Sequence, residues 1–74
     1  MSTQQARAVE LASRRAVQDG YDVSRYDISA QKKGKEWEVF FKRNGTEDKP
    51  SPGDFLTVFV DEAAGRVLRL VPGK

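Results

Sequence analysis

The adjacent carboxylates Asp61 and Glu62 come closest to a chemical site in this chain. Neighbouring carboxylates bind hard cations when several more oxygens converge on one point, and no calcium-loop spacing surrounds this pair. Ala63-Ala64-Gly65 follows, a pattern typical of a short hairpin loop with its glycine in the left-handed conformation. We therefore expect Asp61 to cap a turn and Glu62 to be solvated, with no metal bound.

Other reactive side chains lack the partners that catalysis needs. The chain contains no histidine and no cysteine, which removes the commonest general base, the commonest metal ligand and any thiolate nucleophile. Its serines stand outside a Gly-x-Ser-x-Gly motif, so no nucleophile elbow is predicted. These features favour a protein that is not an enzyme and that uses no cofactor.

A group of lysines suggests contact with a phosphate backbone instead. Lys32, Lys33 and Lys35 lie close together in the sequence, and Trp37 could stack on a base. Acidic residues are interleaved with them, at Glu36, Glu38, Glu47 and Asp48. A small nucleic-acid-binding protein that uses these lysines and the tryptophan is therefore an alternative hypothesis. The competing interpretation is a solvated turn whose lysines protect a sheet edge.

Length and composition predict one small domain that covers residues 1–74. Hydrophobic residues make up 38% and charged residues 32%, and the net charge is +2, values typical of a soluble globular domain. No apolar run approaches the roughly 20 residues that span a bilayer, so membrane insertion is not expected. The polar start contains no signal peptide, which predicts a cytoplasmic protein unless a leader has been removed.

Residues 2–19 have the pattern of an amphipathic helix. Gly20 stands where a helix-ending glycine belongs. A stripe of small residues lets a helix lie close to a sheet while it adds little buried area of its own. The expected stripe consists of Ala6, Ala8, Val9, Ala12 and Ala16, with Leu11 and Val17 at its margins.

Two strands are predicted in the middle of the chain. The first covers residues 26–31, and residues 32–35 form the turn after it. The second covers residues 36–42, where Trp37, Val39 and Phe41 alternate with polar side chains. We expect these three side chains in the core beneath the helix.

Two further strands are predicted at residues 54–61 and 67–71, after a loop at 43–53. In the last strand, Leu68 and Leu70 are expected on one face and Val67 and Val71 on the other. One helix followed by four antiparallel strands predicts an α+β fold, with the helix packed on a four-stranded meander sheet.

The strand at 54–61 is apolar on both faces, and a monomer of this size cannot cover both sides of its sheet. Phe40 is expected to stay exposed, together with either Phe55 and Phe59 or the opposite face of their strand. We predict that Phe40, Phe55 and Phe59 contact a protein partner or a second copy of the chain. Lys42 and Arg43 are expected to form a charged rim.

Two segments, together with the alanine-rich helix, resemble the PepSY domain. They are Gly-Lys-Glu-Trp-Glu-Val-Phe-Phe at residues 34–41 and Val-Phe-Val-Asp-Glu-Ala-Ala-Gly-Arg-Val-Leu at residues 58–68. In that family a helix precedes strands of the type Trp/Tyr-x-Val and Val-x-Val-Asp-x-x-Thr-Gly-x-Val-Leu, and Ala64 stands here in place of the threonine. Members occur in protease propeptides and in secreted or membrane-attached proteins. The resemblance implies a domain that binds and restrains a peptidase.

The same ending also resembles small immunity proteins with a nuclear-transport-factor-like, cystatin-related fold, which neutralise a partner toxin. Both resemblances imply a curved sheet that wraps a helix, and both imply binding without catalysis. The expected function is therefore non-enzymatic protein binding, as a peptidase inhibitor or modulator, through an open sheet face or through strand addition at an edge. A homo-oligomerisation module that pairs the same face with itself remains a further alternative.

Overall fold

The computed structural model describes residues 3–44 and 54–73 of the chain. Helix α1 (Thr3–Gln18) comes first, and the short 3-10 helix η1 (Val23–Arg25) follows it. The remaining elements are four strands, β1 (Tyr26–Lys33), β2 (Glu36–Arg43), β3 (Phe55–Asp61) and β4 (Arg66–Pro72). Most of the predicted loop at 43–53 lies outside the described residues, and so does Ser2, the first residue of the predicted helix.

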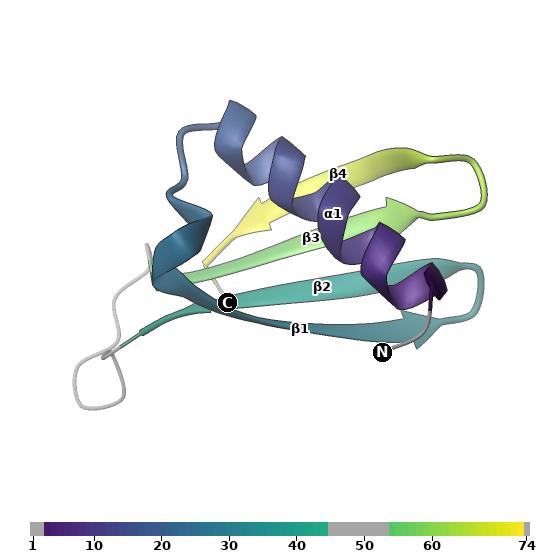
Figure 1. Cartoon of the computed structure of the whole chain (residues 1–74), viewed down its shortest axis with the longest axis horizontal. Coiled ribbons are helices and arrows are strands. Elements are labelled where there is room, and N and C mark those ends of the chain that lie inside the picture. The colour runs from purple at the N-terminus through teal and green to yellow at the C-terminus, as the bar shows by residue number, and fades with distance from the viewer. Residues whose placement is uncertain (1–2, 45–53, 74) are drawn as a thin grey trace.

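The strands form one antiparallel sheet in the order β1-β2-β3-β4, in which each strand pairs with the next along the chain. Helix α1 lies across one face of this sheet, so the described part of the molecule has two layers (Figure 1). This arrangement is the α+β fold predicted from the sequence. No helix in the described ranges is long and apolar enough to cross a membrane.

The core lies between α1 and the sheet. Ala8, Ala12 and Ala16 are fully buried, and their spacing of four residues keeps them on one side of the helix. Because an alanine side chain is short, the strands supply most of the bulk, from Trp37, Val39, Phe41, Leu56, Val58 and Val60. The predicted stripe was too wide, since Ala6 is exposed and the side of the helix that meets the sheet does not reach it.

Helix α1 ends at Gln18, and Gly20 lies just beyond it, in the helix-ending position that the sequence predicted. The Tyr21 N–H donates to the Ala16 carbonyl at 2.9 Å, and the Gly20 N–H donates to the Val17 carbonyl at 3.0 Å. These two bonds form a Schellman motif, which requires a left-handed residue, and Gly20 has φ +93°. The motif turns the chain back toward the sheet, where η1 leads into β1.

Strand β1 is longer than the sequence predicted. Its pairing with β2 runs without interruption from Tyr26 opposite Arg43 to Lys33 opposite Glu36. Only Gly34 and Lys35 form the turn, so the prediction that the turn begins at residue 32 was wrong. A two-residue hairpin turn needs a left-handed residue, and Gly34 meets this need with φ +63°.

Strand β4 contains a bulge that the sequence did not predict. Phe59 pairs with Arg69 and Val60 pairs with Val67, which leaves Leu68 as an extra residue. A bulge shifts the alternation of the strand by one residue. Val67 and Leu70 therefore both pack against the core, whereas Leu68 is 37% exposed. The prediction that Leu68 and Leu70 share a face was wrong for this reason.

Asp61 caps the turn between β3 and β4, as predicted. Its Oδ1 accepts a hydrogen bond from the Ala64 N–H at 3.1 Å, and the Gly65 N–H donates to the Glu62 carbonyl at 3.1 Å. Gly65 has the predicted left-handed conformation, with φ +70°. The carboxylate that looked most like a chemical site thus serves the local backbone.

Candidate protein-binding surface

The sheet face that α1 leaves free carries a group of apolar side chains. Leu56, Val58 and Val60 point toward the helix and are fully buried, so strand alternation places Phe55, Thr57 and Phe59 on the opposite face. Of the two sets that the sequence left open, the structure selects this one. We define the aromatic face as Phe40, Phe55, Thr57, Phe59 and Val71.

Thr57 lies in the middle of the aromatic face. It pairs with Phe40 of β2 on one side and with Val71 of β4 on the other. The three phenylalanines are partly exposed, and Val71 is 43% exposed. Three adjacent strands therefore contribute to one continuous apolar surface.

Phe40 and Phe55 stack on each other. Their ring centroids lie 5.9 Å apart, and the ring planes meet at 21°. An offset stack of this kind is a favourable aromatic geometry, and each ring restricts the rotamers of the other. The pair therefore forms a small preorganised platform on β2 and β3.

Arg69 covers part of the third aromatic ring. Its guanidinium carbon lies 3.9 Å from the centroid of the Phe59 ring, and its Nη1 lies 3.3 Å from Oε1 of Glu36. The guanidinium thus rests on the ring face while the carboxylate of β2 holds it in place. Apolar and charged groups share this end of the aromatic face.

Further charges border the same surface. Lys33 and Glu38 form an ion pair at 2.9 Å, and Glu38 is the register partner of Phe59. Lys42 lies opposite Phe55 on the same face and is partly buried. The predicted rim residue Lys42 is therefore next to the aromatic face, as its place in the alternation requires.

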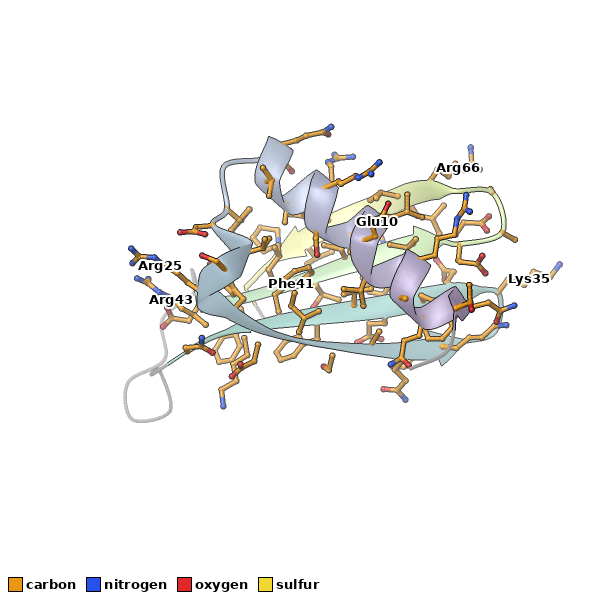
Figure 2. The ribbon with its side chains drawn as sticks, viewed as in Figure 1. Glu10, Arg25, Lys35, Phe41, Arg43 and Arg66 are labelled. Carbon is orange, nitrogen blue, oxygen red and sulfur yellow. The ribbon has the colours of Figure 1, made fainter. Side chains whose placement is uncertain are left out.

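Arg43 lies on the other side of β2, at the end of the sheet. Its Nη1 is 3.7 Å from Oδ1 of Asp54, a carboxylate residue that is only 4% exposed. Figure 2 shows Arg43 beside Arg25 at this end of the molecule. The structure thus separates Arg43 from the aromatic face. Sequence reasoning also missed the burial of Asp54, because its partner is distant along the chain.

Of the four residues proposed for nucleic-acid binding, Lys32, Lys35 and Trp37 line one hollow, whereas Lys33 lies on the other face of the sheet. Trp37 is only 8% exposed and belongs to the core, as its alternation with Val39 predicted. Lys32 and Lys33 are adjacent in β1, so their side chains leave opposite faces of the sheet. The wall of the hollow at the hairpin end, which Lys32, Lys35 and Trp37 line, also includes the acidic residues Asp61 and Glu62.

Sequence reasoning missed Val71, a member of the aromatic face, and Arg69, which covers part of its Phe59 ring. The bulge at Leu68 determines the face of the sheet on which each later β4 side chain lies. The segment Val-Leu-Arg-Leu-Val contains no glycine or proline that would indicate a bulge. No family model, curated protein or solved structure matches the chain.

Proposed function

We propose that this chain is a non-enzymatic protein-binding domain and that the aromatic face is its contact surface. The observation that carries the proposal is the stacked pair of Phe40 and Phe55 beside Phe59, on the sheet face opposite α1. Partly exposed aromatic rings that gather on one face of a small sheet are typical of a protein interaction site.

The arrangement has the anatomy of a protein interface. Binding hot spots are enriched in aromatic residues and arginine, and a polar rim surrounds them. Here the rings lie at the centre, while Glu36, Glu38 and Lys42 border them. Stacking and the Arg69 guanidinium hold the rings in place, which lowers the entropy that a partner would have to remove on binding.

We propose that the partner of the aromatic face is a peptidase. The resemblance to PepSY domains supports a peptidase, which the aromatic face would occlude without any chemistry on this chain. The resemblance to immunity proteins supports a toxin as the alternative occupant of the same face. In either case affinity comes from the buried aromatic rings, and specificity comes from the charges around them.

Site-specific photocrosslinking tests the proposal. A benzophenone amino acid replaces Thr57, at the centre of the aromatic face, and the tagged chain is irradiated in a lysate of the source cells. The matched control carries the same group at Glu10, an exposed residue of α1 (Figure 2). We expect adducts with one protein from position 57 and not from position 10, and mass spectrometry identifies that protein.

The captured protein is then titrated with purified variants. Phe40→Ala combined with Phe59→Asp should lower its affinity by at least about a hundredfold, because two central aromatic contacts are lost. Circular dichroism establishes that the variant remains folded. Unchanged affinity of the folded double variant would refute the aromatic face as the contact surface. If the captured protein is a peptidase, its rate on a peptide substrate shows whether binding restrains it.

A further inference from the structure

The two edges of the sheet differ in how well they are protected. Strand β4 is interrupted by the bulge at Leu68 and ends at Pro72. The Gly73 N–H donates to the Phe55 carbonyl at 2.8 Å, so the backbone groups of Gly73 face β3. Because the backbone groups of successive residues point to opposite sides of a strand, the nitrogen of Pro72 faces the free edge, and proline has no N–H to donate there. Strand β1 has neither device, and its eight residues pair with β2 in an unbroken register. It is the edge on which another strand can add.

One hydrogen bond shows which groups of β1 point outward. The Asn44 N–H donates to the Arg25 carbonyl at 2.9 Å, so odd-numbered residues of β1 bond to β2 and even-numbered residues face the free edge. The side-chain amide of Gln5 donates a hydrogen bond to the Ala30 carbonyl, which points outward, at 3.3 Å. The described residues place no hydrogen-bond partner on the outward groups of Ile28 and Lys32.

We propose that β1 pairs antiparallel with β1 of a second copy of this chain, about a two-fold axis at Ala30, to form one continuous sheet. The outward N–H and C=O groups of the two β1 strands then pair with each other, which gives about six backbone hydrogen bonds across the axis. The bond from Gln5 to Ala30 is replaced by strand pairing. Because the axis is perpendicular to the sheet, both helices lie on the same side.

The side chains of β1 are complementary to themselves in this register. Asp27 lies opposite Lys33 of the second copy, and Ser29 lies opposite Gln31. On the helix side, the aliphatic stem of Lys32 lies opposite Ile28, which is 38% exposed in the single chain. Symmetry repeats each of these pairs, so every favourable contact occurs twice.

Other registers lose this complementarity. A slip that brings Ser29 opposite itself places Asp27 opposite Gln31, and a slip in the other direction places Lys33 opposite Ser29. Lys33 is the only cation of β1 on the same face as Asp27, so only the axis at Ala30 joins them. An axis near residue 32 or 33 would bring the lysines of the two copies close together, and their repulsion disfavours such a register.

Both charged residues already have partners within the chain. Lys33 pairs with Glu38 at 2.9 Å, and the Asn44 amide nitrogen, when it is turned toward Asp27, lies 2.8 Å from both carboxylate oxygens. Asp27 is exposed and the Lys33 side chain is 58% exposed, so each can accept a second contact.

The interface is small, and its formation depends on chain concentration. It leaves the aromatic face uncovered and does not depend on the proposed function.

Sedimentation equilibrium of the full chain at low ionic strength tests the proposal through a charge exchange. The wild type should approach twice its 8.3 kDa mass with rising concentration. Asp27→Lys and Lys33→Glu should each weaken self-association about tenfold, because each places like charges opposite one another twice. The double variant should recover to within about threefold of the wild type, since the exchanged charges attract again. Lys35→Glu, in the turn outside the register, makes the same charge change as Lys33→Glu and should have no effect.

Two results would overturn the proposal. One is a wild type that remains monomeric up to about 1 mM, the range of the weakest specific interfaces. The other is a dimer whose stability the charge exchange does not restore, although circular dichroism shows the variants folded.

Disulfide formation gives a second readout without any change of charge. The natural chain has no cysteine, so Ser29→Cys and Gln31→Cys variants each carry a single thiol. Under oxidation, the mixture of the two should form a crosslinked dimer faster than either variant alone, because residue 29 faces residue 31 of the other copy. Faster crosslinking of either variant alone would contradict this register.

Discussion

The guanidinium of Arg69 lies 3.9 Å above the centre of the Phe59 ring, on the sheet face opposite α1. The same group pairs with Glu36 at 3.3 Å, so the arginine is held between a ring and a carboxylate from two neighbouring strands. A guanidinium is weakly hydrated and flat, which suits it to cover an aromatic ring that would otherwise meet water. Arg69 thus limits the apolar area that the free domain exposes.

Replacement of Arg69 should measure this contact. We expect Arg69→Ala to lower the free energy of unfolding by about 1 kcal/mol, from the lost cation–π contact and the exposed ion pair together. Arg69→Lys should lose about half as much, because an ammonium cannot lie flat on the ring. Glu36→Gln removes only the ion pair and should cost about 0.3 kcal/mol. Urea denaturation provides the values, and equal losses from Arg69→Ala and Glu36→Gln would show that the ring contact contributes nothing.

The parts of this fold that local sequence determines were predictable. Trp37, Val39 and Phe41 alternate with polar residues, and a strand with one buried face has this period. Gly20 and Gly65 occupy positions that only a left-handed residue fits, and Asp61 has its turn partner three residues away. Each of these features depends on neighbours within a few residues, so the sequence carries the necessary information.

The remaining features depend on contacts between distant segments. The segment from Val67 to Val71 reads equally well as a regular strand, and only its pairing with β3 reveals the bulge and the position of Arg69. Strand alternation takes Arg43 off the rim that holds Lys42, and only the fold shows that it pairs with the buried Asp54, beyond residues 45–53. The choice of face for Phe55 and Phe59 likewise required the helix, since β3 is apolar on both sides.

The close approach of α1 to the sheet predicts sensitivity to side-chain size at Ala12. This residue is fully buried against the strands, so Ala12→Leu should lower the free energy of unfolding by about 1–3 kcal/mol through overpacking. Ala6→Leu is the matched control on the same helix, because Ala6 is exposed, and it should change stability by less than about 0.5 kcal/mol. Thermal unfolding followed by circular dichroism compares the two. Similar losses at both positions would restore the wider stripe expected from the sequence.

The turn between β3 and β4 predicts a backbone effect at Gly65. A Cβ there would lie 3.0 Å from Nη2 of Arg7, the flexible end of a side chain that can move, so the cost comes mainly from φ +70°. Gly65→Ala should destabilise the domain by about 1 kcal/mol, whereas Gly65→Asn should cost less, because asparagine tolerates the left-handed region. Chemical denaturation of both variants tests this order. A larger loss for asparagine than for alanine would mean that steric crowding, and not the backbone conformation, decides the cost.

We predict that the contribution of Asp22, which caps η1, to the stability of the domain depends on pH. Hydrogen bonds from the Ser24 hydroxyl, 2.6 Å from Oδ1, and from the Ser24 N–H, at 3.2 Å, lower the pKa of Asp22, and the nearby charge of Arg25 lowers it further. Because the folded-state pKa lies below the unfolded value, the stabilisation is present above the unfolded pKa and is lost as the pH falls through the folded pKa. NMR titration of the carboxyl carbon should show its midpoint rise in Ser24→Ala, and rise less in Arg25→Gln, since the hydrogen bonds are the larger cause. Asp22→Asn should abolish the loss of stability that Asp22 contributes as the pH falls from its unfolded pKa through its folded pKa. A greater rise in Arg25→Gln would assign the low pKa to the ion pair instead of the cap.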